Sequence, residues 1–283
     1  MNRLGFVGAG SMADALIHGI IRSGRALPGE VMVTNRSNTG RLHQVRLRHG
    51  VRITRSKATL ARRSDVILLC VKPPDAAEVL SELRGLVRPR HVVVSVIAGL
   101  PVAFIERELG AGIPVVRAMP NISCRVGESA TVLASGTSAS SKHLSVVEHL
   151  LSAVGSVTTV PEEWLDAVTG LSGSGPAYVY YLMEALAAGG VKAGLPASLA
   201  SELTLQTVLG AAKMVKATGR DPSALRRDVM SPGGTTVAGL SVLDEAGFRQ
   251  ALEEAVRRAA DRSRGLRAFC GPAGDSVPRI AGT

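Results

Sequence analysis

The sequence predicts an α/β amino-terminal domain built on a mostly parallel sheet, followed by an all-helical carboxy-terminal domain. Two observations support this fold class. In the first half, short and almost wholly apolar runs alternate with helical stretches, which is typical of a parallel sheet buried on both faces. Beyond about residue 161 no convincing strand pattern remains, and Ala- and Leu-rich helical patterns continue instead. The 283 residues have room for two domains, which we expect at 1–160 and 161–270, with a disordered tail over 271–283.

The first expected strand runs directly into a glycine-rich turn. The apolar run Leu4–Val7 is followed by Gly8–Ala13, which reads GAGSMA, and then by helical apolar spacing. A strand, a GxGxxA turn and a helix in this order indicate a dinucleotide-binding Rossmann-type domain. In such a turn Gly8 makes the tight bend, Gly10 lets the backbone approach a pyrophosphate, and Ala13 stands at the strand–helix contact. The alternative is a glycine-rich turn with a purely structural role.

The second expected strand, 31–34, ends in Asn35-Arg36-Ser37. A site specific for NAD usually has Asp or Glu at this point to bind the ribose 2′-hydroxyl, and no carboxylate stands here. Arg36 would instead suit a 2′-phosphate. The pattern therefore favours NADPH, with NADH as the other cofactor, against the alternative of an ordinary turn with a solvated arginine.

The later strands of the sheet point to the other half of the cofactor. Ligands of such sheets lie beyond the carboxyl ends of the strands, so Cys70–Pro74 and Ile97–Gly99 should line the nicotinamide side. Asn121 follows another strand and could either contact the nicotinamide or close a turn. The strands that we expect are 51–53, 66–71, 92–97, 115–118, 129–134 and 157–160, and the helices between the first of them are 39–48, 57–63 and 75–86.

The helical half contains a loop of small residues, Ser231–Thr236, which reads SPGGTT. Ser231 can cap a helix, Pro232 suits a first helical turn, and the two glycines let the backbone approach a ligand. Free N–H groups at a helix start favour an anion such as a carboxylate. The hydroxyls of Ser231, Thr235 and Thr236 add uncharged donors. The alternative is an ordinary loop and helix cap.

Composition narrows the classes of partner. The net charge is +10, but the arginines are scattered, and aromatic residues make up 3%, which argues against single-stranded nucleic-acid binding. Three cysteines without metal-ligand spacing indicate no metal site and fit a reducing, cytoplasmic compartment. No apolar run is long enough to span a membrane. The helical half has more apolar surface than one copy can bury, so we expect a homodimer.

Four stretches in order resemble the Δ1-pyrroline-5-carboxylate reductase family of proline biosynthesis: GFVGAGSMA at 5–13, CVKP at 70–73, LSGSGPAY at 171–178 and SPGGTT at 231–236. The resemblance spans about residues 3–268. It implies a Rossmann-type domain, a helical dimerisation domain, and dimers that often assemble into decamers. The cofactor-binding residues that it implies, with Asn121 added from the strand pattern, are Gly8, Ala9, Gly10, Ser11, Met12, Asn35, Arg36, Ser37, Ser56, Cys70, Val71, Lys72, Pro73, Ala98 and Asn121.

The resemblance also implies how the substrate is held. The loop would bind the substrate carboxylate through Ser231, Gly233, Gly234 and Thr235, and Thr236 would reach the ring nitrogen; we take Ser231 and Thr236 as the catalytic pair. The stretch Ile122-Ser-Cys124 departs from the family's Thr-Pro, which leaves a related cyclic imine as an alternative substrate. Two other classes stay open: a β-hydroxyacid dehydrogenase, which would need a catalytic lysine in the helical half, and a non-catalytic NADP-binding regulator or basic nucleic-acid binder.

Overall fold

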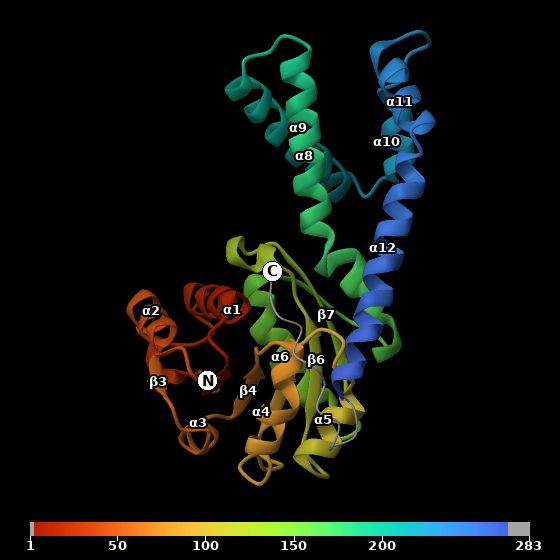
Figure 1. The fold of residues 1–283 in the computed structure, drawn as a ribbon. Helices are drawn as coiled ribbons and strands as arrows, with labels where there is room; N and C mark the ends of the chain where they lie inside the picture. Colours follow the sequence, from red (N-terminus) through yellow and green to blue (C-terminus); the bar gives the residue numbers. More distant parts are fainter. Residues whose placement is uncertain (1–2, 271–283) are drawn as a thin grey trace. The chain divides into compact units, whose positions relative to one another are not determined.

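The structure, a computed structural model, describes residues 3–270, without the side chains of the last two. The predicted tail over 271–283 lies outside the described residues. The chain forms two compact units (Figure 1): one holds the chain up to Ser174 and from Arg257 onward, and the other holds Gly175–Val256. The predicted boundary at 160/161 lies within the first unit, and as a division by function it stays a prediction.

The first unit is built on one eight-stranded sheet with the order β3-β2-β1-β4-β5-β6-β7-β8. Every neighbouring pair is parallel except β6 and β7, which are antiparallel. The order 3-2-1-4-5-6 is that of the Rossmann fold, so the predicted fold class of this half is confirmed. The strands are β1 Leu4–Val7, β2 Val31–Thr34, β3 Arg52–Thr54, β4 Val66–Leu69, β5 Val92–Ser95, β6 Val115–Met119, β7 Ser129–Ser135 and β8 Gly155–Thr159.

Helices cover both faces of this sheet, and the strands explain why. Successive strand residues point to opposite faces, and in β4 Val66 and Leu68 join one apolar core while Ile67 and Leu69 join the other. The first core packs under α1, α2 and α6, and the second under α3, α4 and α5. These helices are α1 Ser11–Arg22, α2 Thr39–His49, α3 Lys57–Arg63, α4 Ala76–Leu83, α5 Val102–Leu109 and α6 Ser141–Leu151.

The remaining helical part of the first unit comes from two distant segments, α7 (Leu165–Val168) and the end of α12 (Phe248–Gly265). The buried carboxylate of Asp166 joins them: the Ser263 hydroxyl donates to its Oδ1 at 2.7 Å, and the Arg267 guanidinium contacts its Oδ2 at 2.5 Å. Gly99, with φ +71, lies close under the same segment, since a Cβ there would be 2.6 Å from the Ser263 carbonyl oxygen. The loop after β5 is therefore packed against the end of α12.

The second unit is all-helical, as predicted, with α8 Gly175–Lys192, α9 Ala197–Thr218, α10 Pro222–Asp228, α11 Thr235–Glu245 and the first turns of α12. None of the residues of α8 or α11 is buried, although both helices are rich in apolar side chains. Among the large apolar side chains left exposed are Leu186, Val191, Leu199, Leu203, Leu209, Met214 and Val242. Exposed apolar side chains gathered in this way mark an interaction surface. No helix within residues 3–270 is long and apolar enough to cross a membrane.

Gly155, at the start of β8, is expected to tolerate no side chain. Its φ is +145, and a Cβ there would lie 2.1 Å from the carbonyl oxygen and 2.3 Å from the nitrogen of Ser129 in β7. We expect Gly155→Ala to lower the free energy of unfolding by about 3 kcal/mol, measured by urea unfolding. Gly24→Ala is the matched control, because its φ is +72 with open space around it, and it should cost about 1 kcal/mol. Equal losses for the two variants would contradict this account.

Candidate functional site

The turn between β1 and α1 has the geometry that its glycines predict. Gly8 has φ +108, its N–H donates to the Thr34 carbonyl at 2.9 Å, and a Cβ would lie 2.4 Å from the Cys70 carbonyl oxygen. Gly10 caps α1 in an extended conformation, and a Cβ there would meet no protein atom within 4 Å. Protein packing thus requires a glycine at position 8. At position 10 the chain leaves open space beside the first turn of α1, where free amides favour a phosphate.

The buried carboxylate of Asp14, on α1, is linked to this turn through Arg41. Asp14 is 5% exposed, and the side chains of two arginines and one histidine surround it. Its Oδ1 lies 2.9 Å from His49 Nε2, and its Oδ2 lies 2.5 Å from Arg48 Nη1 and 3.6 Å from Arg41 Nη2. Arg41 also donates from Nε to the Ala9 carbonyl at 3.0 Å. Arg41, which the sequence did not single out, therefore links the glycine turn to α2.

The Asp14 cluster should make stability depend on acid pH. Burial raises the pKa of Asp14, but the hydrogen bond from His49 and the charges of Arg48, His49 and Arg41 together hold that pKa below its ordinary value. A lowered pKa contributes stability that is present above about pH 4 and is lost as the pH falls through the folded-state pKa. We expect Asp14→Asn to cost about 1–3 kcal/mol at pH 7. Urea unfolding between pH 7 and pH 3 should show a smaller loss for the variant than for the wild type; equal losses would contradict the assignment.

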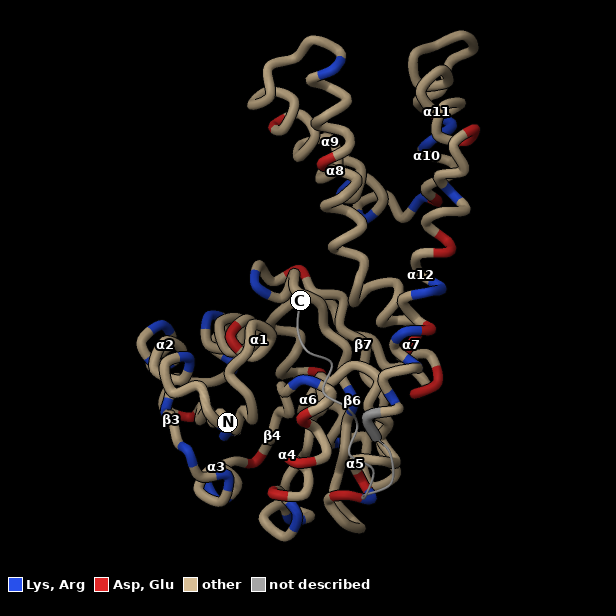
Figure 2. Tube along the Cα trace, viewed as in Figure 1, with Lys and Arg blue, Asp and Glu red and all other residues tan. Residues whose placement is uncertain are grey.

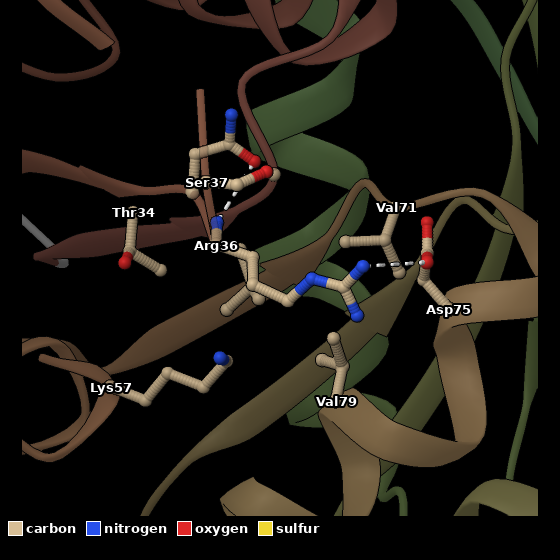
Figure 3. Close-up of a pocket in the computed structure, with 10 residues that line it drawn as sticks. Thr34, Arg36, Ser37, Lys57, Val71, Asp75 and Val79 are labelled. Atoms are coloured by element: carbon tan, nitrogen blue, oxygen red, sulfur yellow. Dashed lines mark hydrogen bonds and ion pairs between the residues drawn. The ribbon is translucent and has the colours of Figure 1, made fainter. Parts of the chain in front are cut away.

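A cavity of about 120 Å³ opens beyond the carboxyl end of β2 (Figure 3). The glycine turn, the Asn35–Ser37 segment and Val71 all contribute to it, so the structure brings together predicted cofactor residues from three places in the chain. Its lining residues are Val7, Gly8, Thr34, Asn35, Arg36, Ser37, Lys57, Val71, Asp75 and Val79. Lys57, which the sequence reasoning missed, gives the cavity a second cation beside Arg36. Its only signal in the sequence was its place next to Ser56.

Ser56 does not line this cavity. Its Oγ accepts a hydrogen bond from Thr59 N at 3.1 Å, so its side chain caps α3. The helix start that Ser56 fixes presents Lys57 to the cavity. Ser56 thus shapes the site through the placement of its neighbour, and a direct contact with the cofactor stays a prediction.

The segments expected on the nicotinamide side follow β4, β5 and β6. Cys70, Val71, Lys72 and Pro73 come after β4, and Ala98 after β5. Burial raises the pKa of the Cys70 thiol, and it raises the pKa of the Cys124 thiol to about 11. Both thiols are therefore neutral at physiological pH, and neither is poised as a nucleophile.

Asn121 after β6 is buried, and both ends of its amide are engaged within the protein. Its Oδ1 accepts from Ser123 N at 3.1 Å, and its Nδ2 donates to the Ser172 carbonyl at 3.0 Å. It thus joins the segment after β6 to the LSGSGPAY stretch. The Cys124 sulfur lies 3.8 Å from the sulfur of Met12 in the first turn of α1.

The SPGGTT loop lies in the second unit, and one detail of its prediction is wrong. We expected Ser231 to cap a helix and Pro232 to stand in its first turn, but α11 begins at Thr235 with Gly234 as its N-cap. Gly233 adopts φ +69, and the Gly234 N–H donates to the Ser231 carbonyl at 2.9 Å. Proline followed by a glycine with positive φ suits a type II turn, which delays the helix.

The turn nevertheless leaves the loop suited to an anion. The first amides of α11, at Thr235 and Thr236, have no partner within the helix, and the helix dipole favours negative charge there. A Cβ at Gly234 would lie 2.3 Å from Ser231 Oγ, so the glycine allows the hydroxyl to fold over the helix start. The predicted substrate residues Ser231, Gly233, Gly234, Thr235 and Thr236 are therefore neighbours around one helix amino terminus. No cluster of metal-binding side chains occurs within the described part of the chain.

These features define a class of protein. A Rossmann sheet with the glycine turn after β1, and a cavity with two cations beyond β2, form the binding domain of an oxidoreductase that uses a nicotinamide dinucleotide. The residues present suit this cofactor, since Gly10 leaves space for a pyrophosphate and no acidic residue follows β2 directly.

The comparisons with known proteins identify the family. Residues 162–266 match the family model described as pyrroline-5-carboxylate reductase dimerisation, and residues 3–99 match that of the coenzyme F420-dependent NADP oxidoreductases. The chain is 42% identical to pyrroline-5-carboxylate reductase 1 of Bacillus subtilis over 262 residues, which cover 93% of this chain and 88% of the relative. It is 42% identical to the Arabidopsis thaliana reductase over 264 residues, covering 93% and 95%.

A solved structure agrees with these relatives. The Plasmodium falciparum pyrroline carboxylate reductase with NADP bound superposes with a TM-score of 0.86 at 31% identity, covering 94% of this chain and 98% of that one. The chain belongs to the pyrroline-5-carboxylate reductase family.

Proposed function

We propose that this protein reduces Δ1-pyrroline-5-carboxylate to L-proline with NAD(P)H, the last step of proline biosynthesis. The observation that carries the proposal is the 42% identity over 93% of the chain to a pyrroline-5-carboxylate reductase. Both halves of the chain contribute, because the family models match the nucleotide-binding part and the helical part separately.

We propose that the first unit binds the cofactor, which supplies a hydride from its nicotinamide C4. Gly8, Ala9, Gly10, Ser11 and Met12 bind the pyrophosphate, supported by the open space at Gly10. Around the adenine ribose the residues are Asn35, Arg36, Ser37 and Ser56, and toward the nicotinamide they are Cys70, Val71, Lys72, Pro73, Ala98 and Asn121. Arg36 in the cavity supports NADPH, with NADH as the second cofactor.

The substrate loop would act by binding and orientation. Amides of Gly233 and Thr235, with the Ser231 hydroxyl, hold the substrate carboxylate at the start of α11. The Gly234 amide, expected from the sequence to share this role, instead donates to the Ser231 carbonyl and closes the turn. Thr236 donates to or orients the ring nitrogen, which gains the electron pair of the C=N bond as hydride adds to the carbon. The proton comes from the protonated imine or solvent, so the loop needs no strong acid. Most of the rate enhancement then comes from holding two reactants in register.

The proposals for the oligomeric state and the cellular location rest on membership of the same family. The match to a dimerisation family supports a homo-oligomer, and we propose a dimer, with a decamer as its larger assembly. We also propose a division into a nucleotide-binding domain 1–160 and a substrate and dimerisation domain 161–270, a cytoplasmic location, and neither nucleic acid nor membrane as a partner. Light scattering that shows a monomer at micromolar concentration would remove the dimer.

The direct test is an assay of NADPH oxidation with pyrroline-5-carboxylate, run beside the reverse reaction with 2-hydroxyacids and NADP. We expect turnover with the cyclic imine alone. Turnover with 2-hydroxyacids alone would favour a β-hydroxyacid dehydrogenase. Absence of turnover with every substrate, together with retention on DNA, would favour the regulator.

A further inference from the structure

Three carboxylates stand on one face of α4 and the turn that leads into it. Asp75 caps α4, and Glu78 and Glu82 follow three and seven positions later. Residues at this spacing lie above one another on a helix surface. Figure 2 shows acidic residues along α4, while basic residues gather on α2, β3 and α3. The carboxylates on this face of α4 can therefore form ion pairs with basic side chains of the neighbouring elements.

Each cation of the cavity beyond β2 is paired with a carboxylate of this face. The Arg36 guanidinium contacts Glu78 directly, and its Nη2 lies 3.9 Å from Asp75 Oδ1. Lys57 Nζ contacts Glu82. In Figure 3 Arg36 extends across the cavity toward Asp75, and Lys57 approaches the same space from α3. The two cations that a 2′-phosphate would meet therefore already have anionic partners.

The two ion pairs, Arg36–Glu78 and Lys57–Glu82, differ in how easily another anion can displace the carboxylate. The side chains of Arg36 and Glu78 are 51% and 53% exposed, whereas Lys57 is 15% exposed. An ion pair as exposed as the first contributes little to stability, so a stronger anion can displace its carboxylate. A phosphate is such an anion, because it carries nearly two negative charges and can offer two oxygens to the planar guanidinium at once.

We propose that Glu78 and Glu82 set the cofactor preference, because they compete with the 2′-phosphate of NADPH for Arg36 and Lys57. A cofactor with a 2′-hydroxyl leaves both ion pairs intact, so these glutamates weaken NADPH binding and spare NADH. The inference rests on the proposed function only in taking a nicotinamide dinucleotide as the cofactor. The proposal predicts that the native protein prefers NADPH to NADH by a smaller factor than a protein that keeps Arg36 and Lys57 but lacks the two glutamates.

The test is the dissociation constant of the full-length protein for NADPH, NADH and 2′,5′-ADP, measured by calorimetry without substrate. We expect Glu78→Gln to tighten NADPH and 2′,5′-ADP about three- to tenfold and to change NADH by less than about twofold. Glu82→Gln should act in the same direction through Lys57. The control is Glu148→Gln on α6, an exposed glutamate outside the cavity lining, which makes the same change in net charge.

Two outcomes would overturn the proposal. One is a Glu78→Gln variant whose affinities for NADPH and NADH change by the same factor or not at all. The other is a gain that persists undiminished in an Arg36→Ala background, because competition for Arg36 requires the two substitutions to be non-additive. Since no imine is present in these measurements, a failure of imine reduction would overturn the proposed function and leave the cofactor result standing.

Discussion

Replacing Thr236 by Ala lowers kcat/KM for imine reduction by about 10²–10⁴-fold if its hydroxyl assists proton transfer at the ring nitrogen. Thr236 is the second residue of α11, directly after the turn that ends at Gly234. It therefore stands next to Thr235, whose amide we assign to the carboxylate. The dissociation constant for NADPH, measured by fluorescence titration, should stay within about twofold of wild type, since the residues that we assign to the cofactor precede residue 122.

Thr236→Ser is the matched control, because it keeps the hydroxyl and removes only a methyl group. It should retain most of the turnover. Thr235→Ala tests the neighbour, whose amide and not its side chain is assigned to the carboxylate, so kcat and KM should both stay within about threefold of wild type. Full turnover by Thr236→Ala would remove Thr236 from the reaction.

The second large effect is expected at the glycine turn, where alanine substitutions at Gly8 and Gly10 should each weaken NADPH binding but for different reasons. Gly8→Ala brings a Cβ within 2.4 Å of the Cys70 carbonyl oxygen at a φ of +108. The turn must move, so we expect a loss of about 2–4 kcal/mol in the free energy of unfolding and at least about a tenfold loss of NADPH affinity. Urea unfolding and calorimetry measure the two effects on the same sample.

Gly10→Ala separates cofactor approach from folding. The added methyl group meets no protein atom within 4 Å, so the folded state should keep its stability within about 1 kcal/mol. NADPH affinity should still fall about 10- to 100-fold, because the methyl group occupies the space that a pyrophosphate needs. A Gly10→Ala protein that binds NADPH as tightly as wild type would show that the pyrophosphate does not approach this glycine.

The sheet and the turn could be predicted because their signals are local. Apolar runs such as Val66–Leu69 are long enough to form a strand. They lack the alternation of apolar and polar residues that a strand with one solvent-exposed face shows. The spacing of Gly8 and Gly10 directly after such a run carries the phosphate-binding geometry within a few residues. The Arg36 position could be found in the same way, since it follows β2 by two residues.

The parts that the sequence did not reveal depend on contacts between distant segments. Neither Lys57 nor Arg41 carries a pattern that distinguishes it from other surface cations; the first gains its place from the cap at Ser56, and the second from the Ala9 carbonyl. The short helix α5 was not expected either. The start of α11 was misplaced because Ser231 and Pro232 favour a helix start locally, whereas the positive φ of Gly233 inserts a turn.

The contacts at the end of α12 also could not be predicted from the sequence. A helical pattern over the last hundred residues gives no sign that Ser263 and Arg267 bind the carboxylate of Asp166. That pairing spans about a hundred positions of the chain and places the helix end on the loop after β5. Only the folded chain reveals it.

The central claim is that a hydride passes from the nicotinamide of the reduced cofactor to the C=N carbon of a five-membered cyclic imino acid. It is tested most directly with NADPH deuterated at C4 on the transferred face, incubated with pyrroline-5-carboxylate and the protein. Mass spectrometry and NMR of the product should show proline with one deuterium at Cδ, the carbon formerly double-bonded to nitrogen, in equal amount to the NADP formed. Oxidation of the cofactor without deuterium in proline, or no proline at all, would contradict the account.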